Sequence, residues 1–325
     1  MTLPTAVNVC APSRLHFGLF SFNDPSSPLQ YGGVGVMINA PGVRLRAERS
    51  DQPKAAGLHA DRVASFARRA AEQIGPAAGA IEWRVNAAPR QHVGLGLGTQ
   101  LGMSVAAAAI ALAGGEAHSA AELAQASGRG LRSAIGAHGF MSGGMLIDGG
   151  HPSTEPLGRL EHRVDLPAAW RFVLIIPPVE EGLANTAEQD AFARMPPPPD
   201  EVTRRLHSLA TDELLPAARG ANFAHFADTL YEYGRSAGEC FAAVQGGPFA
   251  GPAIAERVAL LRSLGVAGCG QSSWGPTVFA VTPDEASAGS LIDQLRDAPS
   301  TSDCDLLAAA PCNTGATVTP LYSSP

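Results

Sequence analysis

A glycine-rich turn that leads into an apolar helix is the segment of this sequence best suited to hold an anion. The stretch HVGLGLGTQLGMS begins at His92, and helical spacing of apolar residues starts at Leu101. Its candidate ligand-binding residues are Gly94, Gly96, Gly98, Thr99 and Gln100. Backbone N–H groups of such a turn converge with the positive end of the helix dipole, which suits a phosphate. The segment matches neither G-x-x-x-x-G-K-[ST] nor G-x-G-x-x-G, so a purely structural turn stays open as an alternative.

Three other segments carry side chains that could complete an anion site. Their candidates are Arg14 and His16 in APSRLHFGLF, then Arg129, Arg132, Ser133, Gly136 and His138 in GRGLRSAIGAHGF, and Ser272 and Ser273 in GCGQSSWGP. Arginine suits a phosphate or a carboxylate, and histidine suits a phosphate or a proton transfer. Each also has a structural alternative as a half-buried, solvent-facing or turn residue. Because Lys54 is the only lysine, anions must be held by arginines, backbone N–H groups and helix ends.

Composition excludes several classes of protein. The 325 residues are 45% hydrophobic and 16% charged, with a net charge of −7 and no basic block, which argues against a nucleic-acid partner. The longest apolar run, 103–113, is shorter than the ~20 residues of a membrane span, so we expect no membrane partner. The start, MTLPTAVNVC, shows no leader pattern, and the five cysteines are scattered without C-x-x-C spacing. We therefore expect a cytoplasmic enzyme.

The pattern of elements predicts an α+β protein with two lobes. Alternation predicts strands at 7–11, 15–19, 43–47 and 81–85, and helical spacing predicts helices at 63–74 and 101–112. In the second half we expect strands at 170–177 and 277–281 and helices at 223–244, 254–261 and 287–296. Strands and helices do not alternate strictly, so we place an N-terminal domain at 1–155 and a C-terminal domain at 156–325. Between two of the strands, YGGVGVMINAPG is dense in turn residues.

The three glycine-containing motifs, taken in order, resemble the signature motifs of the GHMP small-molecule kinase superfamily. The resemblance implies a ribosomal-protein-S5-like N-terminal lobe and a ferredoxin-like C-terminal lobe. In those kinases a segment resembling S-G-x-D supplies the catalytic aspartate. Here the segment 133–144, SAIGAHGFMSGG, places Gly136 at the aspartate position. Phosphoryl transfer to a hydroxyl generally uses a carboxylate there, so this difference disfavours a kinase.

One family within the superfamily accounts better for these differences. GLGLGTQL, GRGLRSAIGAHGF, GGMLIDGG, CFAAVQGG and SSWGP together resemble the β-ribofuranosylaminobenzene 5′-phosphate synthases. The resemblance implies condensation of phosphoribosyl pyrophosphate with 4-aminobenzoate, with loss of CO₂ and pyrophosphate, in tetrahydromethanopterin biosynthesis. It also implies a homodimer that uses no ATP. Mg²⁺ is expected with the pyrophosphate, with Glu188 and Asp190 as candidate carboxylates beside it.

These expectations assign roles to the candidate residues. We expect His138, Arg132 and His16 to be catalytic. We expect substrate or phosphate binding by Arg14, Gly94, Gly96, Gly98, Thr99, Gln100, Arg129, Ser133, Gly136, Ser272 and Ser273. Two alternatives stay open: an ATP-dependent GHMP kinase of a small hydroxylated metabolite, and a non-catalytic protein that binds a phosphorylated ligand.

Overall fold

The larger of two sheets is built around a long antiparallel pair, β1 (Ala6–Leu19) and β2 (Gly33–Arg49). The computed structural model describes residues 2–75, 79–117, 119–151, 155, 157–178 and 195–322. Within these the strand order is β11-β1-β2-β4-β3, and β5 pairs with both β2 and β6. The remaining strands are β3 (Lys54–Gly57), β4 (Ile81–Ala87), β5 (Met145–Asp148), β6 (Leu160–Val164) and β11 (Thr317–Leu321). Strands β6 and β11 thus bring segments from beyond residue 155 into the sheet of the first lobe.

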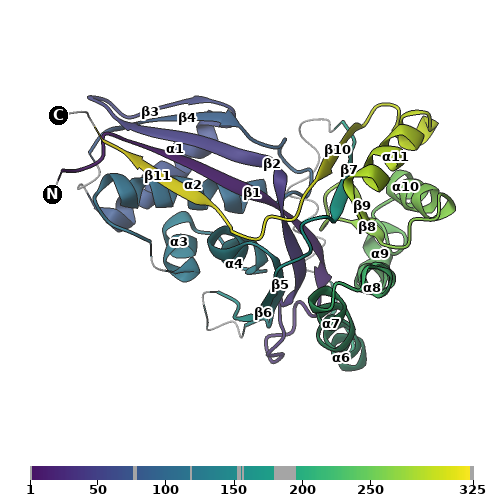
Figure 1. The fold of residues 1–325 in the computed structure, drawn as a ribbon. Helices are drawn as coiled ribbons and strands as arrows, with labels where there is room; N and C mark the ends of the chain where they lie inside the picture. The colour runs from purple at the N-terminus through teal and green to yellow at the C-terminus, as the bar shows by residue number, and fades with distance from the viewer. Residues whose placement is uncertain are drawn as a thin grey trace.

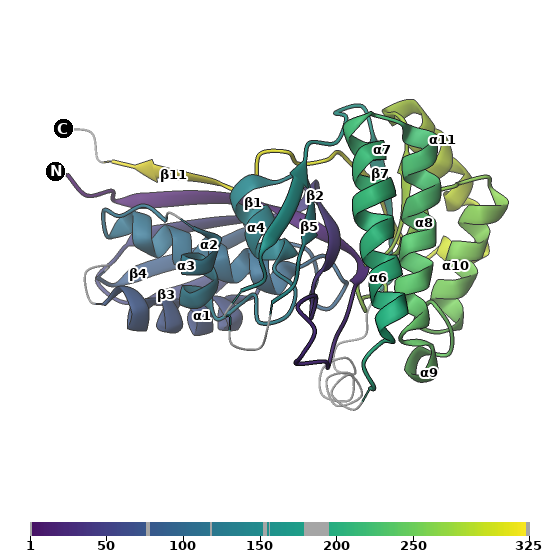
Figure 2. The ribbon, with the colours of Figure 1, turned by 90° about the horizontal axis from the view of Figure 1, so that it is seen from below.

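Four helices cover one face of this sheet (Figure 1). They are α1 (Ala60–Ile74), α2 (Leu97–Leu112), α3 (Ala120–Ser127) and α4 (Ile135–Ser142). Helix α2 is alanine-rich and buried on nearly every side, because α1, α3, α4 and the sheet all pack against it. Figure 2, seen from below, shows α1, α2 and α3 side by side in front of the strands. The start of α2 is therefore held in a fixed position.

The second lobe is an antiparallel sheet packed between two helical layers. Its strand order is β10 (Asp305–Ala309), β7 (Arg171–Ile176), β9 (Val278–Thr282) and β8 (Cys269–Gln271). Val173 and Ile175 pack in the cluster that contains α10 (Pro252–Ser263) and α11 (Glu285–Arg296). Phe172 and Leu174 alternate with them and pack in the cluster that contains the other helical layer. That layer contains α6 (Asp200–Ser208), a π-helical turn (Leu209–Leu214), α7 (Leu215–Arg219) and α8 (Phe223–Glu239), and α9 (Ala242–Gln245) follows α8.

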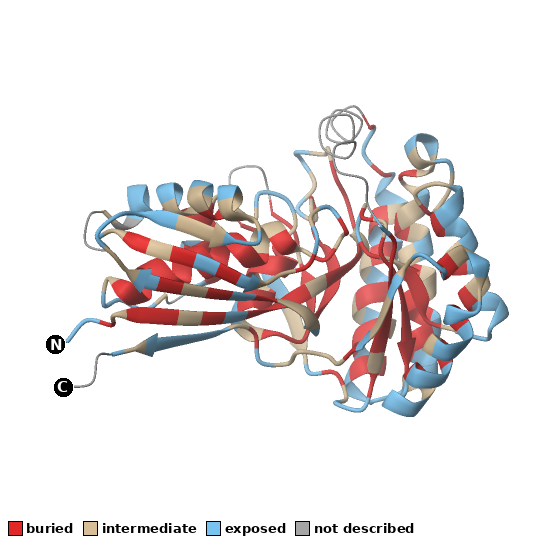
Figure 3. Cartoon of the chain, turned by 90° about the horizontal axis from the view of Figure 1, so that it is seen from above, coloured by how far each residue is buried: buried red, intermediate tan, exposed pale blue. Residues whose placement is uncertain are grey.

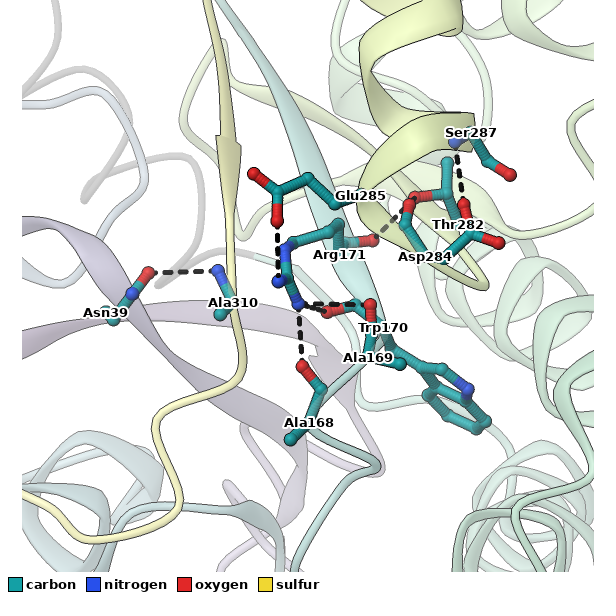
Figure 4. A network of polar contacts seen from close by, with 10 residues as sticks. All are labelled: Asn39, Ala168, Ala169, Trp170, Arg171, Thr282, Asp284, Glu285, Ser287 and Ala310. Carbon is teal, nitrogen blue, oxygen red and sulfur yellow. Dashed lines mark hydrogen bonds and ion pairs between the residues drawn. The ribbon is translucent and has the colours of Figure 1, made fainter.

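The two lobes share one core cluster and a hydrogen-bonded seam. Leu15 and Phe17 of β1 and Val36 of β2 belong to the same buried cluster as Phe172 and Leu230 of the second lobe. Both lobes contain strands with many buried positions, interrupted by intermediate and exposed ones (Figure 3). At the seam, the backbone N–H of Ala310 donates to Oδ1 of Asn39 at 2.9 Å (Figure 4). Close by, the Arg171 guanidinium holds Glu285 and the carbonyls that precede β7.

The predicted two-lobed α+β architecture is confirmed, with differences in three elements. The strands expected at 7–11 and 15–19 form one continuous strand, β1. The glycine-rich segment after Tyr31 forms most of β2 rather than turns. Methyl groups on Gly33 and Gly35 would lie 2.2 Å and 2.5 Å from carbonyl oxygens of β1, so these glycines allow a close approach of two strands. The helix expected over 223–244 ends at Glu239, and α9 follows separately.

Candidate active site

A cavity of about 510 Å³ lies between the lobes, beside the start of α2. One wall comes from β1, Thr99 at the start of α2 and the segment 128–133. The opposite wall comes from the end of α8, residues 241–249 and the third motif at 271–274. Seven of the predicted site residues line it: Arg14, His16, Thr99, Arg129, Arg132, Ser133 and Ser273. The cavity therefore unites candidates that are far apart in the sequence.

Glycines shape the turn that precedes α2. Gly94 and Gly96 have φ angles of 84° and 73°, which glycine adopts without the strain of a side chain. Gly96 caps α2 in the left-handed conformation, with no side chain bonded to the first N–H groups of the helix. The N–H of Arg14 donates to the carbonyl of Leu95, which ties the turn to β1. The N–H groups of Thr99 and Gln100 donate to the carbonyl of Gly96. The positive end of the helix dipole at this turn is where the sequence predicts an anion.

Three arginines gather around that first turn. A methyl group on Gly98 would lie 2.8 Å from Nη2 of Arg62 and 3.0 Å from Nη2 of Arg129. One on Gly96 would lie 3.3 Å from Nε of Arg14. Among the described residues, the buried Nε atoms of Arg14 and Arg129 have no hydrogen-bond partner. Because glycines stand at these positions, the guanidinium groups approach the helix closely.

Burial lowers the pKa of all three arginines, and repulsion from neighbouring arginines adds to this effect for Arg14 and Arg129. Burial and the charge of Arg129 lower the pKa of Arg14 to about 10. Burial, Arg62 and Arg132 lower the pKa of Arg129, and burial lowers that of Arg62. Crowded cations at the positive end of a helix are unfavourable unless an anion joins them. The local electrostatics therefore favour a ligand with several negative charges.

Ser272 joins the glycine turn, β1 and the third motif at one point. Its hydroxyl donates to the carbonyl of Gly94 at 2.8 Å and accepts from the N–H of His16 at 3.1 Å. The N–H of Ser273 donates to the carbonyl of His16 at 2.8 Å. Ser272 is fully buried and does not line the cavity, whereas Ser273 does. Ser272 thus holds the two lobes in register at the site.

His16 begins a chain of polar side chains that runs away from the cavity. Its Nε2 lies 3.1 Å from Oγ of Ser133, which lies 3.5 Å from Oδ2 of Asp148. Burial, and secondarily Arg14, lower the pKa of His16 well below its ordinary value, so the ring is neutral. Burial raises the pKa of Asp148 to about 7, although the N–H groups of Ala134 and Gly150 donate to its carboxylate. Sequence analysis did not identify Asp148 or Arg62.

Three predicted residues lie behind the cavity wall. His138 donates from Nε2 to the carbonyl of Gly158 at 2.8 Å, and burial lowers its pKa. Gln100 is fully buried and donates to the carbonyl of Gly136 at 2.8 Å. A methyl group on Gly136 would lie 3.1 Å from Cγ2 of Thr99, so a larger side chain there would press on the cavity wall. All three contacts support α4 and its packing on α2.

The cavity also has an aromatic part that was missed in the sequence. Phe241, Phe249 and Trp274 contribute to it from the second wall, and Phe17 contributes from β1. The rings of Phe241 and Trp274 meet edge to face, with centroids 5.1 Å apart. Helix α8 adds small residues, of which Ala237 lies against Gly18. Helical spacing could identify Phe241, and strand alternation Phe17, only as core positions, because nothing in either pattern separates a core face from a cavity face. A flat, apolar ligand fits beside this wall.

The described residues do not form a protein-built metal site. They contain no group of three or more His, Cys, Asp or Glu placed to hold a metal ion, and no carboxylate lines the cavity. Glu188 and Asp190 lie outside the described residues. Lys54 is exposed, and its ammonium group lies 3.8 Å from Glu82. Within the described ranges, no helix combines the length and apolarity needed to cross a membrane.

Comparisons with known proteins agree with this fold. The family model for the C-terminal region of GHMP kinases matches residues 220–301. The β-ribofuranosylphenol 5′-phosphate synthase of Archaeoglobus fulgidus is 30% identical, over 88% of this chain and 90% of that protein. The synthase of the same name from Methanothermobacter thermautotrophicus is 29% identical, over 84% of this chain and 88% of that protein.

Solved structures show the same fold at low identity. A homoserine kinase from Cytophaga hutchinsonii superposes with a TM-score of 0.64 at 15% identity, covering 97% of this chain and 98% of that one. Mevalonate pyrophosphate decarboxylase from Streptococcus pyogenes gives a TM-score of 0.68 at 11% identity, covering 96% and 98%. The chain therefore has the predicted GHMP-kinase-like fold.

Proposed function

The chain belongs to the family of β-ribofuranosylphenol 5′-phosphate synthases, and we propose that it joins ribose 5-phosphate to a ring carbon of 4-aminobenzoate. The donor is phosphoribosyl pyrophosphate. The bond from ribose C1 to pyrophosphate breaks, and the bond from C1 to the ring carbon forms. The carboxylate then leaves that carbon as CO₂, and its bond electrons return to the ring. The product is an aminobenzene riboside for tetrahydromethanopterin biosynthesis.

The observation that carries this proposal is the group of arginines around the first turn of α2. Arg14, Arg62 and Arg129 crowd a helix N-terminus, and buried donors of Arg14 and Arg129 have no protein partner among the described residues. Phosphoribosyl pyrophosphate supplies a phosphate and a pyrophosphate, which match such a site in charge and in number of acceptor oxygens. As pyrophosphate leaves, its negative charge grows, so these donors stabilise the transition state more than the ground state.

The aromatic wall suits the acceptor. Phe17, Phe241 and Trp274 form an apolar surface against which a benzoate ring can pack while its polar groups reach the opposite wall. The same wall limits water around the ribosyl cation that develops at C1. Arg132, exposed at the rim of the cavity, is suited to the aryl carboxylate.

The reaction also accounts for Gly136. A kinase must remove a proton from a hydroxyl nucleophile, which is the task of a carboxylate at that position. Here the nucleophile is a ring carbon that carries no proton and loses CO₂ instead. No general base is then needed at Gly136, and a Cβ atom there would lie only 3.1 Å from Cγ2 of Thr99.

Mg²⁺ belongs to the proposal as a companion of the substrate. Because no carboxylate lines the cavity among the described residues, those residues do not fit a metal ion held by the protein alone. Mg²⁺ commonly reaches phosphate-binding sites on the phosphate oxygens and would neutralise charge on the pyrophosphate. Removing it with a chelator should slow the reaction, and added Mg²⁺ should restore the rate.

The test uses acceptors labelled in the carboxyl group. We expect labelled CO₂ from 4-aminobenzoate only when phosphoribosyl pyrophosphate is present, with one pyrophosphate for each CO₂. A parallel reaction with 4-hydroxybenzoate tests the acceptor, because the relatives' name denotes a phenol product. Release from 4-hydroxybenzoate alone would correct the acceptor. Release from neither would refute the proposal, and ATP consumption with an alcohol acceptor would favour a kinase. Donor binding without any turnover would favour a non-catalytic binding protein.

A further inference from the structure

Asp148 is a buried carboxyl group to which the proposed reaction assigns no task. It ends β5, is fully buried, and lies one side chain away from the cavity. The side chain between them is Ser133, which lines the cavity together with His16. Two backbone N–H groups, of Ala134 and Gly150, donate to the carboxylate. Asp148 thus has a structural role, and its link to His16 is a separate feature.

The donors and acceptors fix the direction of this chain when Asp148 is ionised. An ionised carboxylate only accepts, so the single hydroxyl proton of Ser133 points to Asp148 across 3.5 Å. The Ser133 oxygen then accepts from Nε2–H of His16, at 3.1 Å. The N–H of Ile135 also donates to this oxygen, at 3.3 Å, which favours the same direction. His16 therefore carries its proton on Nε2, and Nδ1 has no partner among the described residues.

Protonation of Asp148 reverses the chain. A carboxylic acid can donate to the Ser133 oxygen, and the Ser133 hydroxyl is then free to donate to Nε2 of His16. The proton of the imidazole moves to Nδ1, which changes from an acceptor into a donor. Because burial raises the pKa of Asp148 to about 7, this change falls near neutral pH. Charged or titratable groups that face the chain are Arg14 from β1, Glu161 from β6 and Tyr233 from α8.

We infer that Asp148 is a positioning residue that acts through Ser133 to hold His16 in the tautomer with its proton on Nε2. Nδ1 is then the ring atom that accepts a hydrogen bond from the amino or hydroxyl group of the aryl acceptor. As the ring carbon attacks ribose C1, positive charge spreads to that group and its N–H or O–H becomes a stronger donor. A fixed acceptor there stabilises the transition state more than the ground state. The identity of the ligand rests on the proposed function, whereas the tautomer does not.

The direct test is the tautomer of His16 in the unliganded protein, read from ¹⁵N shifts of labelled histidine and assigned with His16→Gln. At pH 8.5 we expect the proton on Nε2 in the wild type. Ser133→Ala breaks the chain while Asp148 keeps both backbone donors, so we expect a mixture or the Nδ1–H form. Ser142→Ala is the matched control, since its hydroxyl donates to the carbonyl of His138 on the same helix. A wild-type Nδ1–H form, or no change in Ser133→Ala, would overturn the inference.

Kinetics supply the second readout. In the wild type kcat should rise as the pH increases through about 7, because Asp148 then ionises. This limb should disappear in Ser133→Ala and Asp148→Asn, with kcat about 100-fold lower at pH 8.5 and KM for the donor nearly unchanged. A merely structural Asp148 would leave the limb intact in Ser133→Ala, which overturns the inference. Turnover without the expected tautomer refutes the positioning role alone, and the expected tautomer without any turnover refutes the proposed function alone.

Discussion

Two arginines beside the first turn of α2 favour the binding of a ligand at the expense of the stability of the free protein. Arg14 and Arg129 each bury a guanidinium nitrogen that has no hydrogen-bond partner among the described residues. Burial and the charge of Arg129 lower the pKa of Arg14, whereas burial and the charges of Arg62 and Arg132 lower the pKa of Arg129. A buried, unpaired donor costs about 1–3 kcal/mol, and more when it is charged. Such side chains are expected where an anion binds. Their removal should therefore weaken binding of the anion without destabilising the free protein.

Arg129→Met should weaken donor binding without destabilising the free protein. We expect KM for phosphoribosyl pyrophosphate to rise about 10- to 100-fold, since a charge-assisted hydrogen bond contributes about 1.5–3 kcal/mol. The melting temperature without ligand should stay the same or rise, because a buried repulsion is removed. Arg84→Met, at an exposed position of β4 beside Glu82, is the control and should change neither quantity. A clear loss of thermal stability in Arg129→Met would assign the arginine a structural role.

The ionisation of Asp148 should appear in stability as well as in catalysis. Its pKa rises from 3.8 in the unfolded chain to about 7 in the folded protein, so the folded protein binds this proton more tightly. The contribution of Asp148 to the free energy of unfolding should therefore be largest at low pH. It should fall by about 4 kcal/mol at most as the pH rises to about 7, and stay constant above.

Denaturant unfolding of wild type and Asp148→Asn at pH 5 and pH 8 measures this change. From pH 5 to pH 8, the free energy of unfolding of the wild type should fall relative to that of the variant. The hydrogen bonds lost in Asp148→Asn change this difference by the same amount at both pH values. Asp51→Asn, at an exposed carboxyl, is the control. A wild type that gains stability relative to Asp148→Asn at pH 8 would contradict the assignment.

At the scale of elements, the glycines of α2 serve two different purposes. Gly98 lies in the first turn, and the far ends of two arginine side chains occupy the space beside it. Gly102 lies one turn later, and a methyl group there would meet Cε1 of Phe66 at 3.0 Å and Cβ of Ser127 at 3.1 Å. Gly98 therefore shapes the anion site, whereas Gly102 allows α1 and α3 to pack on α2.

Alanine substitutions should separate these purposes. Gly98→Ala displaces only flexible guanidinium ends and improves helix propensity by up to ~1 kcal/mol, so stability should hold while KM for the donor rises. Gly102→Ala presses on a ring and a Cβ atom, and should cost about 1–3 kcal/mol of stability with KM nearly unchanged. Unfolding free energies and KM measured for both variants check this. The reverse assignment, with KM affected only by Gly102→Ala, would contradict it.

The periodicity of apolar residues predicted most helices and strands. It failed where one sequence pattern is compatible with two structures. Glycines in the segment after Tyr31 indicated turns, but Gly33 and Gly35 stand in β2 because β1 approaches closely there. Motif matching found the wall that contains Arg14 and Thr99. It could not find Arg62, which comes from α1 and reaches the site only through packing of that helix on α2. The link from His16 to Asp148 likewise depends on the pairing of β5 with β2, which no local pattern encodes.

At the scale of the whole molecule, the two long strands tie the lobes together. Val7 and Val9, in the first half of β1, belong to the buried cluster that also contains residues of α2. Later in the same strand, Leu15 and Phe17 belong to the cluster that contains Trp170 and Phe226 of the second lobe. The order of the motifs predicted two lobes, and the folded chain shows that each lobe has a buried cluster of its own beside the one that both share. The cavity therefore lies between two lobes that a shared core cluster joins.

This continuity predicts that both lobes unfold together. The sequence holds three tryptophans, and Trp83 lies in the first cluster whereas Trp170 packs on Phe223 and Phe226 of α8. Two variants report each region separately: Trp170→Phe with Trp274→Phe leaves Trp83, and Trp83→Phe with Trp274→Phe leaves Trp170. Unfolding one lobe would pull β1 and β2 out of the other, so both lobes should unfold in one transition. In each variant, the denaturant midpoint measured by tryptophan fluorescence should therefore coincide with the midpoint measured by circular dichroism. Within either variant, fluorescence and circular dichroism transitions with clearly separated midpoints would show that the lobes unfold independently.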